Sequence, residues 1–405
     1  MTLHAFEGFG IEIEYAIVDR DSYDVRPIAD RLLELAAGKA TNELARGRVG
    51  WSNELSLHVL ELKTNGPAPA LDGVAEDFAA ELRFADDLLA PLGARILPCA
   101  MHPWMDPHTE QRLWPHEQTE IYRAYDRIFG CRGHGWANLQ SMHINLPFAD
   151  DVEFVRLHDA IRTVLPLLPA LAAASPFADG RVTGLLDTRL EVYRGNQRRV
   201  PEIAGRVVPE AVTSIDEYHA RILEPMYRAI APLDPDGVLH GEWLNSRGAI
   251  ARFDRGAIEI RVLDAQESPR ADLDIAVAVV AVVRALYEER PSAAAAQAAL
   301  DTACLADLFE ATVRDADAAV IDDPAYLGAL GLDPAAPWTA GAAWCALLER
   351  HAGQRWQRAP LARRLLAASG SSPTRADLAA VCRGLCTALA GNTLFGVAGD
   401  PPLNR

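Results

Sequence analysis

Apolar and polar residues alternate in four segments of the chain, the pattern of strands with one buried face. From Phe9 to Val18 the alternation places Glu12 and Glu14 on one face and apolar side chains on the other. Three further strands are predicted at Ser56–Lys63, Ser141–Leu146 and Ala257–Leu263. The first strand therefore carries two carboxylates that point the same way.

Helical periodicity fills the long intervals between these strands. The predicted helices span Asp72–Leu89, Glu117–Phe129, Val152–Leu165 and Ser214–Ile230, the last with a capping box from Ser214 to Glu217. Because the intervals are long and irregular, we expect an α+β fold rather than a regular succession of βαβ units.

The last third of the chain has a different character. From Ala271 to Ala390 it is rich in Ala and Leu with helical spacing, and its final helix follows a Ser372-Pro373 cap and ends at Gly391. We therefore expect a unit that carries the chemistry over residues 1–290 and a helical region over residues 291–405 packed on it.

Composition narrows the class of protein. The 405 residues are 50% hydrophobic and 23% charged, which is typical of a soluble globular protein. A formal net charge of −17 disfavours binding to nucleic acid or anionic lipid. The start MTLHAFEGFG has no signal-peptide pattern, the longest apolar stretch (Ile275–Val283) is too short for a membrane span, and the six scattered cysteines form no CxxC pair. We expect a cytoplasmic protein that contacts neither nucleic acid nor membrane.

The common nucleotide and hydrolase motifs are missing, so the candidates are acidic residues on strands. Glu12 and Glu14 are close enough to disfavour joint ionisation unless a cation lies between them, and they predict a metal site; the alternative is a solvent-facing strand. Glu54 and Glu61 add two carboxylates, but their spacing puts them on opposite faces of a regular strand. They converge only if the chain bends or bulges between them.

Two more strands carry candidate side chains. His143 shares a face with Ser141 and Asn145, and is either a cation ligand or a hydrogen-bonded core residue. Glu259 and Arg261 lie two residues apart, oriented for a cation and a phosphate oxygen respectively; the alternative is a surface ion pair.

Two loops are less specific. Six arginines between Arg181 and Arg206 form a local positive island that either neutralises an anionic substrate or is a solvated loop. The segment Pro98–Pro107 offers His102 and Trp104 either as substrate contacts or as packing residues.

Five motifs in order, GIEIEY, ELKTN, QSMHINLPF, ASPFADGRVTGLLDTR and AIEIRVLDAQ, resemble those of the glutamate-cysteine ligase type 2 family of carboxylate-amine ligases. The resemblance spans about Gly10 to Ala285. It implies a glutamine synthetase-like α+β fold, in which a curved, mainly antiparallel sheet with flanking helices binds ATP, divalent cations and an amino acid on its concave face.

The resemblance also assigns roles to single residues. The implied metal ligands are Glu12, Glu14, Glu54, Glu61, His143 and Glu259. Arg261 would contact the nucleotide phosphates, with Lys63 and Asn145 as further nucleotide-binding candidates. Arg189 would contact the transferred phosphate or the substrate carboxylate.

The implied reaction joins an acid to an amine. ATP with Mg²⁺, or Mn²⁺, phosphorylates the carboxylate, and the amine then displaces phosphate to leave an amide. The partners are small-molecule amino-acid and amine substrates. Two alternatives stay open, a phosphotransferase of guanidino-kinase type and a non-catalytic nucleotide-binding member. A homodimer is also open, because apolar helices such as Ile275–Leu286 could cover a second subunit.

Overall fold

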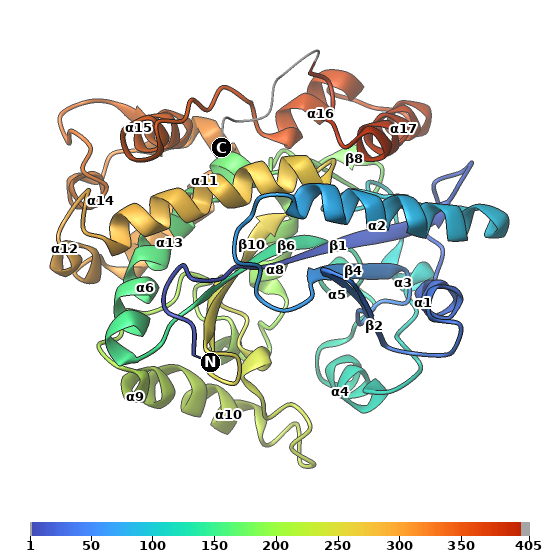
Figure 1. Ribbon diagram of the computed structural model, residues 1–405, viewed down its shortest axis with the longest axis horizontal. Helices are drawn as coiled ribbons and strands as arrows, with labels where there is room; N and C mark the ends of the chain where they lie inside the picture. The colour runs from blue at the N-terminus through green and yellow to red at the C-terminus, as the bar shows by residue number, and fades with distance from the viewer. Residues whose placement is uncertain (1, 398–405) are drawn as a thin grey trace.

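A single eight-stranded sheet forms the centre of the computed structural model, which describes residues 2–397 (Figure 1). Its order is β2-β3-β4-β1-β6-β10-β9, with β5 paired to the far end of β1, and these pairings are antiparallel. The strands are β1 (Gly10–Asp19), β2 (Glu43–Arg46), β3 (Val49–Asn53), β4 (Val59–Thr64), β5 (Ala94–Leu97), β6 (Ser141–Pro147), β9 (Ala249–Arg252) and β10 (Ala257–Asp264).

The four predicted strands are the four neighbours β4, β1, β6 and β10 at the centre of this sheet. The second of the predicted segments begins later than expected, at Val59 rather than Ser56. The other four strands were not predicted, because each is only four or five residues long and lacks a clear alternation.

One face of the sheet is apolar and covered by helices. Ile11 and Ile13 of β1, Leu62 of β4 and Ile144 of β6 are fully buried. The long helices α2 (Val74–Leu89) and α11 (Pro269–Tyr287) run across this face and contact each other, and α6 (Asp151–Val164) packs beside α11 (Figure 1). The apolar side of α11 is thus covered within this chain, and the opposite face of the sheet is left for polar side chains.

The predicted helices form, with small changes at their ends. The remaining helices of the first 268 residues are α1 (Ala29–Ala37), α3 (Pro107–Glu110), α4 (Thr119–Phe129), α5 (His134–Ala137), α7 (Pro169–Ala172), α8 (Thr188–Gly195), α9 (Ile215–Tyr218) and α10 (Glu224–Ile230). A π-helical turn (His219–Leu223) joins α9 to α10, and a two-stranded ribbon pairs β7 (Phe177–Ala178) with β8 (Arg181–Val182).

One predicted capping box forms only in part. The Ser214 hydroxyl accepts a hydrogen bond from the Glu217 N–H, but the Glu217 carboxylate turns to the N–H of Thr213 instead of that of Ser214. In the final helix the cap is Thr374, which forms a complete capping box with Asp377, rather than the predicted Ser372-Pro373 pair.

The C-terminal region is helical, as the sequence predicts. It contains α12 (Ala294–Ala298), α13 (Thr302–Asp315), α14 (Pro324–Ala329), α15 (Ala340–Ala352), α16 (Leu361–Ser369) and α17 (Arg375–Gly391), with a short ribbon of β11 (Val320–Ile321) and β12 (Trp338–Thr339). Helix α15 contacts α11, and α17 contacts α2 and β5. The division at residue 290 stays a prediction, and residues 1 and 398–405 lie outside the described part.

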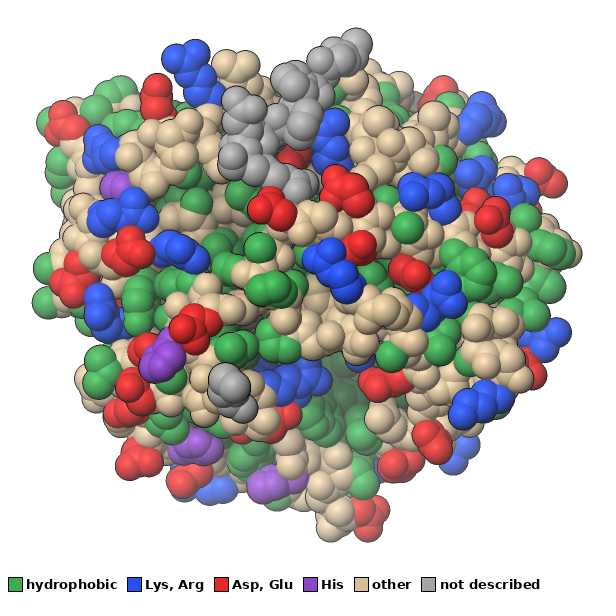
Figure 2. Space-filling view, viewed as in Figure 1, with side chains coloured by type: hydrophobic (Ala, Val, Ile, Leu, Met, Phe, Trp, Pro, Cys, Tyr) green, Lys and Arg blue, Asp and Glu red, His purple; other side chains and the backbone are tan. Residues whose placement is uncertain are grey.

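On the face seen in Figure 2, charged side chains are spread out rather than gathered by sign. Figure 2 shows acidic and basic residues interspersed over one face, with a hollow near its lower centre, below the sheet as Figure 1 places it. Across residues 2–397, every helix is too short or too polar to pass through a bilayer.

Candidate active site

Strand register brings the predicted residues together on the polar face of the sheet. Glu12 of β1 pairs with Lys63 of β4 on one side and with His143 of β6 on the other. Glu14 pairs with Glu61 of β4. Directly paired residues of antiparallel strands point to the same face. Side chains that lie far apart in the sequence therefore form one continuous polar surface.

Three carboxylates meet at one end of this surface. Glu14, Glu54 and Glu61 each place a carboxylate oxygen within 4.8 Å of the others. Glu54 directly follows β3 and Glu61 lies within β4, so the reversal of the chain between these two paired strands joins them. The expected bend within a single strand is therefore replaced by a connection between two strands. We call these three residues the carboxylate cluster.

The chemistry of the carboxylate cluster suits a hard divalent cation. Burial, together with the charges of Glu61 and Glu14, raises the pKa of Glu54 well above its usual range. Burial and the charges of Glu12 and Glu14 also raise the pKa of Glu61 to about 7, although Lys63 and a 2.7 Å hydrogen bond from Ser52 oppose this. A divalent cation bound among these crowded groups would displace their protons and remove the repulsion between them, and carboxylate oxygens are the ligands that Mg²⁺ prefers.

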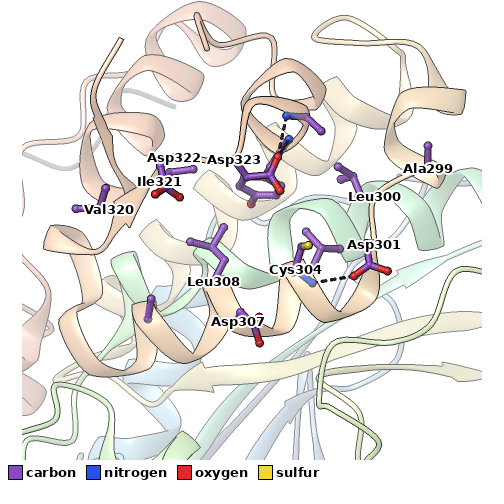
Figure 3. Close-up of a pocket in the computed structure, with 14 residues that line it drawn as sticks. Ala299, Leu300, Asp301, Cys304, Asp307, Leu308, Val320, Ile321, Asp322 and Asp323 are labelled. Carbon is purple, nitrogen blue, oxygen red and sulfur yellow. Dashed lines mark hydrogen bonds between the residues drawn. The ribbon is translucent and has the colours of Figure 1, made fainter. Parts of the chain in front are cut away.

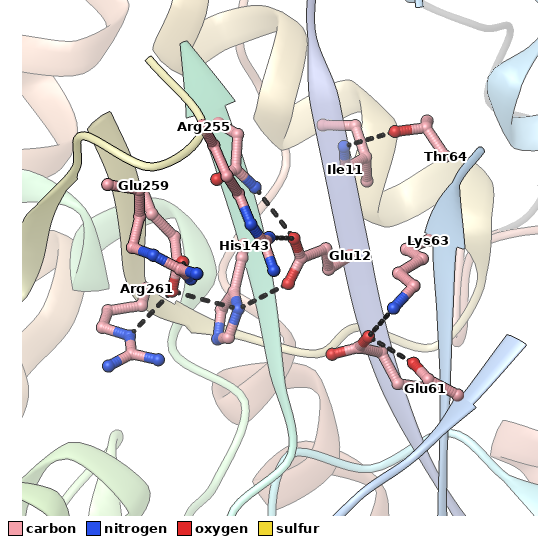
Figure 4. Close-up of polar contacts among 12 residues, drawn as sticks. Ile11, Glu12, Glu61, Lys63, Thr64, His143, Arg255, Glu259 and Arg261 are labelled. Carbon is pink, nitrogen blue, oxygen red and sulfur yellow. Dashed lines mark hydrogen bonds and ion pairs between the residues drawn. The ribbon is translucent and has the colours of Figure 1, made fainter. Parts of the chain in front are cut away.

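A second group of ligand-type side chains lies beside the first. The Nδ1 atom of His143 is 3.4 Å from Oε2 of Glu12 and 3.6 Å from Oε1 of Glu259 (Figure 4). We call these three residues the histidine cluster. Asn145 donates a 3.1 Å hydrogen bond to the other oxygen of Glu12. Two carboxylates and one imidazole are an acceptable ligand set for Mg²⁺ and a better one for Mn²⁺.

Cationic neighbours keep the histidine cluster ionised. Burial alone would raise the pKa of Glu12, but His143, Arg255 and Lys63 lower it to about 2. Burial lowers the pKa of His143, and the contacts with Glu12 and Glu259 more than offset this, so its pKa is raised. The two clusters share β1 but differ in their electrostatic surroundings.

Three arginines surround Glu259 and Glu12. Arg261 Nε lies 3.0 Å from Oε1 of Glu259, and Arg252 Nη1 lies 3.2 Å from its Oε2. Arg255 Nη1 lies 3.6 Å from Oε1 of Glu12, and half of the Arg255 side chain is exposed (Figure 4). Sequence reasoning found Arg261 but missed Arg252 and Arg255. Their signal was the RFDR segment that joins β9 to β10 immediately before Glu259.

A β-bulge in β10 changes which side chains reach the polar face. The register with β6 shifts between Ile260 and Leu263, so Asp264 pairs with Ser141. A bulge places one extra residue opposite its partner strand and reverses the alternation beyond it. Asp264 therefore joins the polar face at the position that strict alternation would give to Leu263.

The structure buries Arg189 against Asp264 of the polar face. It is the second residue of α8, is 1% exposed and forms a buried ion pair with Asp264. One of its terminal nitrogens, Nη2, has no hydrogen-bond partner within the described residues. Burial lowers the pKa of Arg189, but Asp264 and Asp187 more than offset this, and the charge of Glu14 adds to the rise. The predicted contact with phosphate or substrate stays a prediction.

Three of the other five arginines of the predicted positive island form ion pairs. Arg181 pairs with Asp179, Arg194 with Glu191, and Arg206 with Asp307. The part of these three arginines in binding an anionic substrate stays a prediction.

The Pro98–Pro107 segment packs instead of lining the site. His102 is 1% exposed, and its Nε2 lies 2.8 Å from the carbonyl oxygen of Tyr23. Trp104 donates a hydrogen bond to Asp24, and the Arg375 guanidinium of α17 lies over its ring. These contacts favour the packing role for both residues.

A groove of about 540 Å³ lies apart from the sheet, between α13 and the β11–α14 segment (Figure 3). Most of its carboxylates already have structural roles. Asp301 caps α13, Asp323 caps α14 and Asp307 pairs with Arg206. The polar face of the sheet is therefore the better candidate for chemistry.

A family model described as glutamate-cysteine ligase family 2 matches residues 8–380. The chain belongs to this family. The predicted family is thereby confirmed. Over 283 residues the chain is 39% identical to an uncharacterised protein of Archaeoglobus fulgidus, covering 70% of this chain and 75% of that one. It is 26% identical over 289 residues to a glutamate–cysteine ligase of Halobacterium salinarum, covering 70% and 72%.

A solved structure of a glutamate–cysteine ligase shares the fold of this family member. The crystal structure of glutamate–cysteine ligase from Francisella tularensis, in complex with AMP, aligns with a TM-score of 0.59 at 14% identity, covering 94% of this chain and 88% of that one. The predicted α+β, glutamine synthetase-like fold with its mainly antiparallel sheet is confirmed.

Proposed function

We propose that this protein is an ATP-dependent carboxylate-amine ligase that forms an amide bond through an acyl phosphate. The observation that carries the proposal is the placement of two adjacent ligand clusters, from distant segments of the chain, on one face of the sheet. Membership of a ligase family supports it, as does the AMP complex of the Francisella tularensis enzyme.

Each cluster has a proposed role in holding a divalent cation. The carboxylate cluster would hold one ion, and the histidine cluster would hold another. Bound between carboxylates and ATP, such ions supply charge neutralisation for the transferring phosphoryl group.

Two arginines beside the histidine cluster are candidates to contact the phosphates of ATP. Arg261 is tied to Glu259 yet keeps 20% of its side chain exposed, and Arg255 is half exposed at the rim. We assign them to the phosphates of ATP, where fixed cationic donors are worth several kcal/mol in a site shielded from water. Lys63, 3.7 Å from Glu61, would orient that carboxylate and stay close to the nucleotide.

The reaction follows from the need to activate the acid. A carboxylate does not react with an amine at neutral pH, so phosphorylation converts it into an acyl phosphate with a good leaving group. The amine attacks the acyl carbon, the bond to the phosphate oxygen breaks, and inorganic phosphate leaves with its electron pair. Glutamate is the first acid to test, and cysteine is one amine among several.

The test is a coupled measurement of ADP, phosphate and product mass. Purified protein receives ATP, Mg²⁺ and pairs of amino acids or amines. We expect ADP and phosphate in equal amounts only when both an acid and an amine are present, with a product mass equal to their sum less one water.

Two outcomes would overturn the proposal. ADP formed with a single substrate and a stable phosphorylated product would show a phosphotransferase. Absence of ATP binding in equilibrium dialysis with Mg²⁺ would show a non-catalytic member. The Glu259→Gln variant controls for contaminating ATPases. It should have the circular dichroism spectrum of the wild type but no turnover.

A further inference from the structure

Ser141 is hydrogen-bonded to both ligand clusters. It is the first residue of β6 and is 6% exposed. Its backbone N–H donates a 2.8 Å hydrogen bond to Oε2 of Glu14, and its hydroxyl lies 3.1 Å from the same oxygen. The hydroxyl also lies 2.9 Å from Nε2 of His143. One side chain therefore connects the carboxylate cluster to the histidine cluster.

The single proton of the hydroxyl decides how these contacts are used. An ionised carboxylate only accepts hydrogen bonds, so the Ser141 hydroxyl must donate to Glu14. Its oxygen can then accept from His143 only if Nε2 carries a proton. In the opposite orientation two acceptor oxygens, of Ser141 and Glu14, would face each other at 3.1 Å without a proton between them.

The same assignment fixes the other ring nitrogen of His143. In the metal-free protein Nδ1 faces the carboxylates of Glu12 at 3.4 Å and Glu259 at 3.6 Å, which is the contact of a protonated ring nitrogen. When a cation takes the place of that proton, the proton that stays is on Nε2, and the lone pair of Nδ1 is directed at the cation. A metal-bound histidine commonly has its tautomer fixed by a hydrogen bond to the nitrogen that does not bind.

We propose that Ser141 is a positioning residue for both cation sites, holding Glu14 in place for one ion and presenting Nδ1 of His143 to the other. The inference rests on the proposed function, because it requires that the clusters bind cations. It adds a residue that touches neither ion and acts through two ligands at once.

The first test measures Mn²⁺ binding in the presence of a non-hydrolysable ATP analogue, and so without any turnover, by electron paramagnetic resonance of the free ion. We expect the wild type to bind ions at both clusters and Ser141→Ala to bind at both about 10–100-fold more weakly, the usual effect of losing a ligand's hydrogen-bond partner. Pulsed resonance separates the sites, because only the ion at the histidine cluster shows nitrogen coupling.

Ser52 provides the matched control. Its hydroxyl donates to Glu61 at 2.7 Å, the one carboxylate to which it is hydrogen-bonded among the described residues, so Ser52→Ala should weaken the carboxylate cluster alone. Ser141→Thr keeps the hydroxyl and should restore binding at both clusters. Thermal melts of the three variants report on folding.

The second test needs no variant. In the wild type loaded with Mg²⁺ and the same ATP analogue, with ¹⁵N-labelled histidine, two-bond nitrogen–proton correlations should show the proton of His143 on Nε2. A proton on Nδ1 would overturn the inference, as would wild-type affinity of Ser141→Ala at either cluster. If the wild type binds no Mn²⁺ at all, the proposed function itself fails.

Discussion

The carboxylate cluster and the histidine cluster share β1 but balance their charges in different ways. Glu14, Glu54 and Glu61 lie within 4.8 Å of one another, and Lys63 approaches only the last of them. In the histidine cluster both carboxylates have basic partners: His143 faces both, Arg255 approaches Glu12, and Arg252 and Arg261 bind Glu259. The first cluster needs a cation from solution, whereas the second is balanced by the protein's own side chains.

This difference predicts an order of binding. A divalent cation from solution should bind first at the carboxylate cluster, where it removes repulsion between acids. At the histidine cluster the arginines oppose a free cation. We expect that site to take its ion together with ATP, whose phosphates neutralise the arginines.

The largest expected effect comes from removing one carboxylate of either cluster. Glu54→Gln and Glu259→Gln should each lower turnover by about 10²-fold or more, the scale of losing one charged contact near the reacting group. Without nucleotide, however, only Glu54→Gln should lose Mn²⁺ binding, because Glu54 belongs to the site that fills first. Calorimetric Mn²⁺ titrations with and without a non-hydrolysable ATP analogue measure this.

The order of binding would be wrong if Glu259→Gln, rather than Glu54→Gln, removed the ion that binds without nucleotide. Both variants replace a carboxylate by an amide of the same shape, so they control for each other. Unchanged melting temperatures would show that the losses are local.

The local pattern of the sequence was enough to predict some members of each cluster. Alternation identified Glu12, Glu14 and Glu259 as side chains on strand faces, and Ser141 was visible on the face of His143. Glu54 was assigned through the family resemblance, because its convergence with Glu61 depends on the pairing of β3 with β4. Strand pairing joins residues that are distant in sequence, and no local period encodes it.

The short elements were also beyond the local pattern. Strand β9 reads Ala-Ile-Ala-Arg, is buried throughout and has no polar alternation, so its Arg252 was not recognised as a partner of Glu259. The bulge in β10 likewise depends on the partner strand. The pattern therefore predicted which side chains share a face but not which of them meet.

Gly10 allows the histidine cluster to be packed closely, and a methyl group there should disturb it. A Cβ atom at Gly10 would lie 2.9 Å from Cβ of Asn145, the residue that holds Glu12. We expect Gly10→Ala to destabilise the protein by about 1–3 kcal/mol, the range for overpacked sites. Urea unfolding measures the change.

The control for this prediction is Gly38→Asn. Gly38 ends α1 with a φ of 73° and has no atom within 4 Å of a Cβ position, so asparagine, which tolerates this conformation, should cost less. Equal losses for the two variants would contradict the close approach at Asn145.

The carboxylate cluster should make the metal-free protein less stable as pH rises. The pKa of Glu61 is about 7 in the folded protein against an ordinary value of 4.5. A raised pKa of an acid stabilises the fold below the unfolded value, and this contribution is lost as pH rises through the folded value. Between pH 5 and 8 the melting temperature should therefore fall more for the wild type than for Glu61→Gln.

The expected difference between these two proteins is a few degrees. Adding Mg²⁺ should remove it, because the ion favours the ionised carboxylates. Parallel pH curves for wild type and Glu61→Gln without metal would refute the role assigned to Glu61.

The smallest effect separates the two clusters most directly, because it should change two measurements in opposite directions. Arg255 lies near Glu12 and is half exposed, so Arg255→Ala should raise the KM for ATP about fivefold, the worth of about 1 kcal/mol for such a contact. Loss of the same charge should tighten the binding of Mn²⁺ at the histidine cluster and leave the carboxylate cluster unchanged.

The control is Arg83→Ala. Arg83 is an exposed arginine of α2 on the covered side of the sheet, and its loss should change neither the KM for ATP nor the affinity for Mn²⁺. If KM and Mn²⁺ affinity weakened together in Arg255→Ala, the arginine would be supporting the ligand geometry, and the contrast in charge between the clusters would not set their order of binding.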